Sequence, residues 1–175
     1  MPRQETDLNP VSHITIDAIG KPGQRVFYIQ AFQGDTPTTF IVEKIQVQTL
    51  VIGIMQFLEE IRTRHPELAE ADGDYDEDQM RIEPPVDPLF RSGELGLAYD
   101  ETVDLMVLAV REILLSGMAE DDASEVRLWC RREQLLALAR WATEVIEHGR
   151  PICPQCGEPM EPEGHFCPKK NGHKH

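Results

Sequence analysis

The sequence predicts an α+β fold, in which antiparallel strands carry two helices and a small zinc-ribbon-like module follows at the C-terminus. Three observations lead to this prediction. Strand-like runs precede a helix-like run, and this order occurs twice along the 175 residues. Hydrophobic residues make up 41% of the chain and charged residues 27%, a composition typical of a domain that buries a core. Three of the four cysteines fall within the last 23 residues.

Three strands are expected first, over residues 12–19, 25–33 and 38–44. Residues 12–19 alternate apolar and polar side chains, which is the period of a strand with one buried face. Residues 25–33 are rich in β-branched and aromatic side chains. The segments 20–23 and 34–37 contain glycine and proline and predict tight turns, so the three strands should form an antiparallel meander.

A helix is expected over residues 46–64, ending near Pro66. Its apolar residues recur at the three- and four-residue spacing that places them on one face. They are Val47, Leu50, Val51, Ile54, Leu58 and Ile61. An acidic loop over residues 67–85 follows. From Glu67 to Asp78 seven residues are acidic and none is basic, so this stretch is expected to lie in solvent.

The same order is expected again in the second half of the chain. Strands are predicted over residues 95–99, 103–115 and 124–130. A second helix then carries the apolar stripe Leu135, Leu138, Ala139, Ala142, Val145 and Ile146. Gly149 and Pro151 follow it, an arrangement that ends helices.

The repeated order of elements, βββα and again βββα, suggests an internal duplication. The halves would be residues 12–64 and 92–148. Together they form an expected α+β domain over residues 1–148, and residues 149–175 form the small module. Helices would cover one face of the strands, since an uncovered apolar face would remain in water.

The charge of the chain excludes some classes of partner. There are 17 Lys and Arg against 31 Asp and Glu, a net charge of −14. Duplex nucleic acid and anionic membrane surfaces attract basic proteins, so neither is an expected partner. The first residues do not resemble a secretory signal, and no apolar stretch approaches the ~18 residues that span a bilayer. We therefore expect a cytoplasmic protein.

The C-terminal cysteines have the spacing of metal ligands. Cys153 and Cys156 lie two residues apart and are followed by Gly157, so that one turn can direct both sulfurs at one ion. Cys167 is followed by proline, as Cys153 is. Thiolate-rich tetrahedral sites favour Zn²⁺. Residues 149–175 are too few to build a core, so a closed, structural zinc would supply their folding energy.

The spacing leaves two candidates for the fourth ligand. His165 lies two residues before Cys167, and His173 lies six residues after it. The chain can turn back at Asn171 and Gly172, so spacing alone favours His173.

Four stretches of the sequence are distinctive. They are KPGQRVFYIQA (residues 21–31), VEKIQV (42–47), DPLFRSGELGLAYD (87–100) and GRPICPQCGEPMEPEGHFCPKKNGH (149–173). They resemble an uncharacterised bacterial family, domain of unknown function three-thousand-and-ninety, over nearly the whole chain. The most specific part is the C-terminal pattern CPxCG…GHxCPxxNG.

The resemblance bears on the metal site and on partners. In the family pattern the pair that matches His165 and Cys167 is integral, whereas the place of His173 is often aromatic. The resemblance therefore implies His165 as the fourth ligand. It implies no established activity. The neighbouring genes of the family imply a protein partner that resembles a histidine phosphatase.

Two classes of function follow from these observations. The first is a zinc-stabilised accessory or protein-interaction protein without chemistry of its own. The second is an enzyme, a hydrolase or transferase, with a polar cleft between the two halves. Arg25, Tyr28, Arg91 and Asp100 are the candidate cleft residues. The sequence contains no GxSxG, GxxxxGK[ST], GxGxxG or HExxH motif, so the standard hydrolase, nucleotide and zincin patterns are missing.

Overall fold

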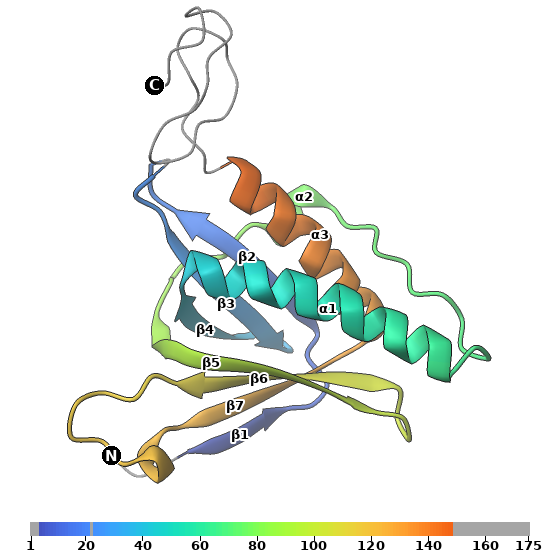
Figure 1. Ribbon diagram of the computed structural model, residues 1–175. Coiled ribbons are helices and arrows are strands. Elements are labelled where there is room, and N and C mark those ends of the chain that lie inside the picture. Colours follow the sequence, from blue (N-terminus) through green and yellow to red (C-terminus); the bar gives the residue numbers. More distant parts are fainter. Residues whose placement is uncertain (1–3, 22, 149–175) are drawn as a thin grey trace, which may run out of the picture.

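The computed structural model describes residues 4–21 and 23–148, and in this part of the chain the α+β class is confirmed (Figure 1). A seven-stranded sheet has the order β1-β7-β6-β5-β4-β3-β2. The elements are β1 (Glu5–Leu8), β2 (His13–Ile19), β3 (Val26–Gln33), β4 (Thr36–Val42), α1 (Lys44–Arg64), α2 (Glu77–Met80), β5 (Pro88–Asp100), β6 (Leu105–Glu112), the 3-10 helix η1 (Glu120–Asp122), β7 (Glu125–Cys130) and α3 (Arg132–His148).

The sheet is mixed, whereas the sequence predicted an antiparallel one. Two antiparallel meanders, β2-β3-β4 and β5-β6-β7, lie side by side. Strand β5 is parallel to β4, because the crossover through α1 returns the chain to the end of the sheet where β4 began. Strand β1 was not predicted and is parallel to β7.

The described elements follow the predicted order of two βββα units, with β1, α2 and the 3-10 helix in addition. The duplication itself stays a prediction. Boundaries differ most in the second half. Strand β5 begins at Pro88 rather than at Leu95, and β6 ends at Glu112 although the apolar run continues to Leu115. Leu114 and Leu115 are exposed, so the predicted strand was too long because it was based on hydrophobicity alone.

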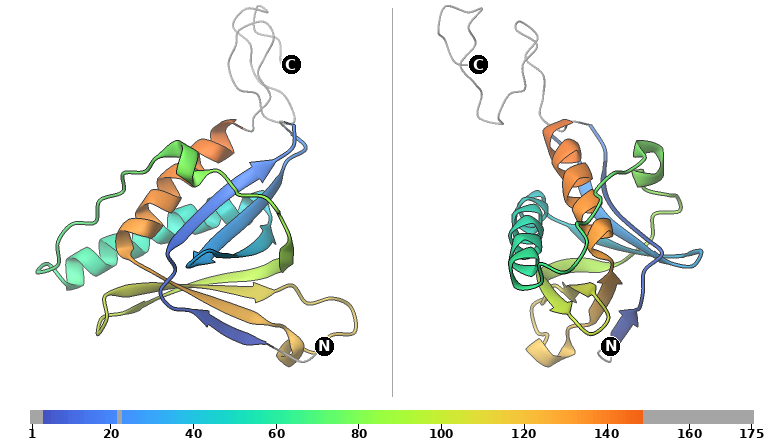
Figure 2. Two further views of the ribbon diagram at one scale, coloured as in Figure 1. Left: turned by 180° about the vertical axis from the view of Figure 1, so that it is seen from behind. Right: turned by 90° about the vertical axis from the view of Figure 1, so that its right-hand side faces the viewer.

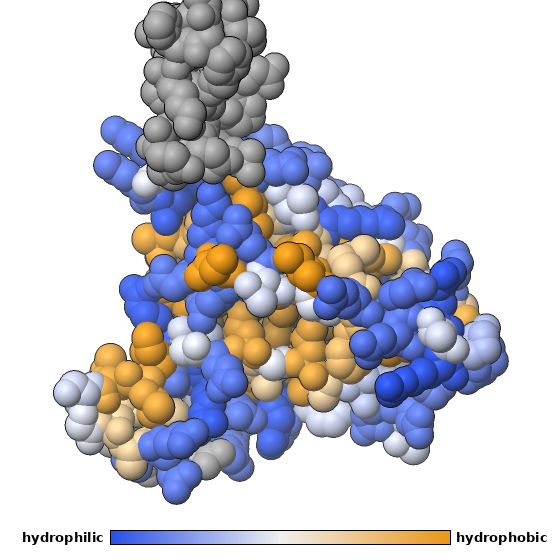
Figure 3. All heavy atoms as spheres, in the orientation of Figure 1, coloured by the Kyte–Doolittle hydropathy of each residue, from blue (hydrophilic) through white to orange (hydrophobic). Residues whose placement is uncertain are grey.

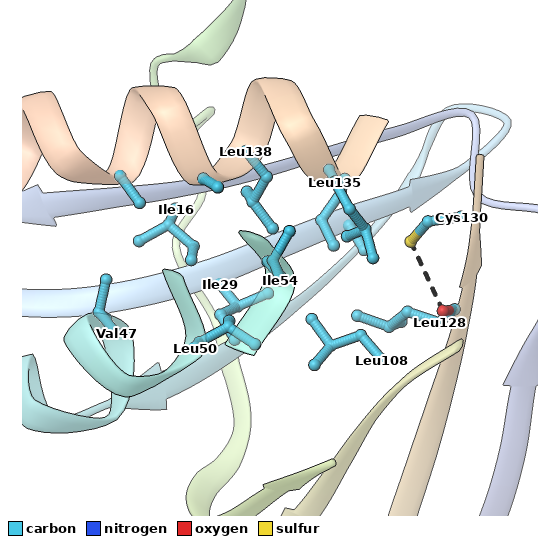
Figure 4. Close-up of a cluster of buried hydrophobic side chains, with 14 of the residues drawn as sticks. Ile16, Ile29, Val47, Leu50, Ile54, Leu108, Leu128, Cys130, Leu135 and Leu138 are labelled. Carbon is cyan, nitrogen blue, oxygen red and sulfur yellow. Dashed lines mark hydrogen bonds between the residues drawn. The ribbon is translucent and has the colours of Figure 1, made fainter. Parts of the chain in front are cut away.

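The core lies between the sheet and the two long helices. Helices α1 and α3 pack against each other, and α3 also packs against β2 (Figures 1 and 2). Figure 4 shows buried side chains that meet from both helices and from strands of both meanders. The labelled ones are Ile16, Ile29, Val47, Leu50, Ile54, Leu108, Leu128, Cys130, Leu135 and Leu138. Burial of apolar area of this kind is the main favourable term in folding.

The opposite face of β2-β3-β4 is covered by residues 77–83, which we call the strap (Figure 2, left). Three buried side chains of the sheet hold its backbone. Thr15 donates to the carbonyl of Met80 at 2.5 Å, and Asp17 accepts from the amide of Ile82 at 2.9 Å. Gln30 accepts from the amide of Glu83 at 2.8 Å and donates to its carbonyl at 3.0 Å. Residues 67–85 therefore differ from the expected solvated loop, because their second half is fixed to the sheet.

The two edge strands, β1 and β2, are consecutive in the sequence. Residues 9–12 join them and bridge both meanders. The amide of Val11 donates to the carbonyl of Trp129 in β7 at 2.8 Å, and the amide of Ser12 donates to the carbonyl of Phe32 in β3 at 2.7 Å. These bonds draw the two ends of the bent sheet together. No helix in the described ranges is both long and apolar enough to cross a membrane.

Candidate functional site

Three hollows follow one another along the seam between α1 and β5. The seam exists because α1 directs Val47, Leu50 and Ile54 into the core, while its neighbouring flank faces β5. Gly53 lies on this flank, where a Cβ atom would be in ordinary van der Waals contact with Leu97 of β5, at 3.5 Å. We call the hollows, in order from the start of α1, the basic hollow, the apolar groove and the His65 pocket.

The apolar groove occupies the middle of the seam and has a volume of about 390 Å³. Its walls include Ile45, Thr49 and Leu50 of α1 and Leu95 and Leu97 of β5. Figure 3 shows apolar side chains gathered in the middle of this face of the molecule. Ile45 is 66% exposed, and Ile52, which continues the same stripe of α1, is 59% exposed. Large aliphatic side chains that are this exposed to solvent and lie along one face of a helix are typical of a surface that another protein covers.

The basic hollow lies at the start of α1 and has a volume of about 320 Å³. Arg25, Lys44 and Arg91 line it together with Glu43. The guanidinium of Arg25 lies 5.0 Å from the ring centre of Phe27 and donates to the carbonyl of Val145 at 2.6 Å. Burial lowers the pKa of Arg25, and the charge of Asp17 partly opposes that shift.

Arg91 and Lys44 supply the other two charges of the basic hollow. Arg91 Nη1 lies 2.6 Å from Glu43 Oε1. Lys44 is the first residue of α1, and no acidic side chain follows it in the first turn. The hollow therefore holds three cations and one carboxylate, on a chain whose net charge is −14.

The His65 pocket lies at the far end of α1 and has a volume of about 460 Å³. Glu60, His65 and Glu101 are among its lining residues. The imidazole of His65 lies 3.4 Å from Glu67 through Nδ1 and 3.4 Å from Glu101 through Nε2. Its ring also contacts that of Tyr99, with 5.9 Å between the centres.

A chain of hydrogen bonds continues from Tyr99 away from this pocket. The hydroxyl of Tyr99 donates to Asp104 at 2.7 Å, and Arg132 donates to both oxygens of Asp104 at 2.8 and 3.0 Å. Burial, followed by the bond to Asp104, raises the pKa of Tyr99 to about 12. The bond from Arg132 lowers the pKa of Asp104. At neutral pH the phenol therefore keeps its proton, and the carboxylate stays charged and paired. These hydrogen bonds stabilise the fold and do not transfer a proton.

The structure brings together two of the four residues that the sequence proposed for a cleft. Arg25 and Arg91 line the basic hollow. Tyr28 belongs to the face of β3 opposite Phe27. Asp100 lines the His65 pocket at the other end of β5, where it accepts from the amide and the hydroxyl of Thr102. These bonds lower the pKa of Asp100 and fix the turn that follows β5.

The sequence analysis missed His65, Asp104 and Arg132. They come from three separate elements, and nothing in their local sequence marks them. Asp104 does have a positive φ of 50°, an uncommon value for a residue other than glycine, but only the structure reveals it. The proposed metal ligands Cys153, Cys156, His165 and Cys167, and the alternative His173, lie outside the described residues. Within the described ranges, no group of three metal-ligating side chains is placed to hold an ion.

Comparison with known proteins assigns the chain to a family. A family model described as "Protein of unknown function (DUF3090)" matches residues 6–167. The match spans most of the chain, and the chain belongs to this family. None of the curated proteins and none of the solved structures matches it.

Proposed function

We propose that this member of the DUF3090 family is a cytoplasmic, zinc-stabilised accessory protein that binds a segment of another protein in the apolar groove. The observation that carries the proposal is the groove itself. It combines about 390 Å³ of open volume with the exposed side chain of Ile45 in its wall, and Ile52, which does not line the groove, continues the exposed stripe of α1. Such a surface costs free energy in water unless a partner covers it.

The chemistry of the partner follows from charge. Two copies of this chain would each carry a net charge of −14, and the repulsion between them opposes self-association. Glu94 is the charged residue that lines the groove, and Glu60 and Glu101 line the pocket that follows it along the seam. A segment with apolar side chains on one face and Lys or Arg on the other would complement this surface. The histidine-phosphatase-like protein implied by the family resemblance is the first partner to test.

The zinc site belongs to the same proposal. Cys153, Cys156 and Cys167 would supply three thiolates, and His165 would supply the fourth ligand. The spacing of the cysteines supports this set. The family match ends at residue 167, so it includes His165 and leaves out the alternative ligand His173. The zinc would be structural, since four protein ligands leave no open position for a substrate.

The alternative of a hydrolase or transferase has no comparable support among the described residues. Its four candidate residues occupy three separate places rather than one cleft. The strongest polar network, from Tyr99 to Arg132, holds its proton and its charge at neutral pH. General acid–base catalysis is most effective with a group whose pKa lies near the working pH.

A binding experiment with a matched control tests the proposal. The full chain would be combined with the histidine-phosphatase-like protein, and the affinity would be measured for wild type, Ile45→Glu, which changes a wall of the groove, and Val103→Glu. Both substitutions place a carboxylate at an exposed aliphatic position, but Val103 lies in the turn between β5 and β6, away from the groove. We expect Ile45→Glu to weaken binding at least tenfold and Val103→Glu to leave it unchanged.

A photo-crosslinker at position 45, in the wall of the groove, extends the experiment to partners in the cell. The expected product joins the groove to a basic, amphipathic segment of a different protein. Crosslinks only between two copies of this chain, or equal loss of binding in both variants, would contradict the proposal. A wild-type chain that binds no protein in either experiment would contradict it too.

A further inference from the structure

The basic hollow carries an excess of positive charge that the fold neutralises only in part. Arg25, Lys44 and Arg91 face one carboxylate, that of Glu43. Among the lining side chains, three cations and one anion leave a net charge of +2 on a chain whose total is −14, and Asp17, which lies outside the lining but acts on Arg25, offsets part of this excess. Like charges gathered in one concave site repel each other, so a site of this kind gains free energy when an anion enters it.

The three cations keep donors that the fold has not used. One terminal nitrogen of Arg25 donates a hydrogen bond to the carbonyl of Val145, and the guanidinium group lies over the ring of Phe27. One nitrogen of Arg91 donates a hydrogen bond to the carboxylate of Glu43. None of the described residues forms a hydrogen bond or ion pair with the ammonium of Lys44. A guanidinium has five N–H donors and an ammonium three, so most of them remain available.

The positions of the cations are set by separate and rigid parts of the fold. Arg25 precedes β3, Lys44 begins α1, and Arg91 lies within β5. The bonds to Val145 and Glu43 hold the two guanidinium groups in place, which reduces the entropy that an incoming ligand must offset. The 21-residue helix α1 adds a weaker contribution, since its first turn points partial positive charge in the same direction.

We propose that the basic hollow binds the dianionic group of a phosphate monoester. Three cationic side chains against one lining carboxylate suit a phosphate dianion better than a singly charged carboxylate, and planar guanidinium forks fit phosphate oxygens. The volume of about 320 Å³ exceeds that of one phosphate group, so an organic remainder is accommodated beside it. The basic hollow shares no lining residue with the apolar groove.

Isothermal titration calorimetry on the full chain tests the site with defined probes. Phenyl phosphate and benzoate share the ring and differ in the charge and geometry of the anionic group. Inorganic phosphate lacks the organic remainder. All three would be titrated at one ionic strength set with chloride. We expect phenyl phosphate to bind most tightly, inorganic phosphate more weakly, and benzoate weakest.

Two substitutions and one control show whether the measured heat of binding arises in the basic hollow. Lys44→Gln keeps a good helix former at the start of α1, and Arg91→Gln removes a guanidinium at an exposed position of β5. Each should weaken phenyl phosphate binding roughly tenfold, the effect of losing one hydrogen bond to a charged group. Arg62→Gln removes the same charge near the other end of α1 and should leave the affinity unchanged.

Several results would overturn the proposal. One is the absence of binding of phenyl phosphate to the wild-type chain. Another is equal affinity for benzoate, which would show that the dianion is not recognised. Tighter binding of inorganic phosphate than of phenyl phosphate would exclude an ester as the ligand. Equal weakening in Arg62→Gln would assign the effect to overall charge instead of to the hollow.

Discussion

Asp104 forms hydrogen bonds with two side chains and has a left-handed backbone conformation that few residues other than glycine adopt. Its carboxylate binds Arg132 through both oxygens and also accepts from Tyr99, while its φ is 50°. Asparagine has nearly the same shape and tolerates the left-handed region. Asp104→Asn therefore removes the charge and leaves the backbone undisturbed.

We expect Asp104→Asn to lower the free energy of unfolding by about 1–2 kcal/mol. The guanidinium of Arg132 is 14% exposed and would lose its counter-charge, although the partial exposure of Asp104 moderates the cost. Urea denaturation measures the change. Glu59→Gln breaks the exposed pair with Arg62 and should cost much less, since solvent screens that pair. Equal effects of the two substitutions would show that the Asp104 pair contributes no more than a surface pair.

The thiol of Cys130 should be unreactive in the folded protein. Burial raises the pKa of Cys130 to about 12, so almost no thiolate exists at neutral pH. Iodoacetamide followed by peptide mapping should leave Cys130 unmodified in the native chain and alkylate it in urea. Rapid native modification at Cys130 would contradict its burial.

The same shift predicts how stability responds to alkaline pH. The pKa of the Cys130 thiol is 9.0 when unperturbed and about 12 in the folded chain. Between these two values the unfolded chain loses the proton and the folded chain keeps it. Deprotonation therefore favours unfolding, and the free energy of unfolding should fall as the pH rises from about 9 toward 12. The raised pKa of Tyr99 adds to this trend, and Cys130→Ala should reduce it.

At the level of elements, the strap is the segment whose attachment depends most on polar side chains. Gln30 is fully buried and satisfies both the amide and the carbonyl of Glu83. Gln30→Leu would leave these backbone groups unpaired, at a cost of about 2–3 kcal/mol. Hydrogen exchange of the amides of residues 81–83 should accelerate far more than that of β3. Uniform acceleration throughout the sheet would instead show that the strap and the sheet open together.

The elements show which parts of the fold the sequence could predict. The strands β2, β3 and β4 and the helices α1 and α3 have apolar patterns of period two or 3.6, and each was predicted. Strand β1 reads Glu-Thr-Asp-Leu, with little apolar character, and is defined by its pairing with β7. The parallel pairing of β4 with β5 depends on how α1 crosses the sheet, which no local pattern encodes.

The candidate site was predictable in the same partial way. Arg25 and Arg91 were proposed as cleft residues, and they meet because β3, β4 and β5 are neighbours in the sheet. Tyr28 follows Phe27 directly in β3, so strand alternation alone places it on the other face. The apolar groove arises from the contact of α1 with β5, and it could not be derived from the stripe of α1 considered by itself.

At the scale of the whole molecule, the proposed zinc should be separable from the α+β domain. The described helices and strands share one core, whereas Cys153, Cys156, His165 and Cys167 all follow α3 in the sequence. Elemental analysis of protein purified without chelator should give about one zinc per chain. Removal of the zinc should leave the far-ultraviolet circular dichroism of the domain nearly unchanged.

Single substitutions assign the ligands. Cys153→Ser should abolish stoichiometric zinc, and Cys130→Ala should retain it because Cys130 is a core residue. His165→Ala and His173→Ala distinguish the two candidates for the fourth ligand. Full zinc content in Cys153→Ser, or a zinc-free wild-type chain, would contradict the proposed site.

The pairing of β1 with β7 has a consequence for synthesis on the ribosome. Glu5 lies opposite Glu125, so the strand made first must wait for about 120 further residues before its partner leaves the exit tunnel. Until then the nascent chain cannot complete the sheet, and its N-terminal residues remain accessible to chaperones and proteases. A shortened N-terminus would leave the β7 margin open to strands from other chains, and aggregation of newly made protein is the failure to expect.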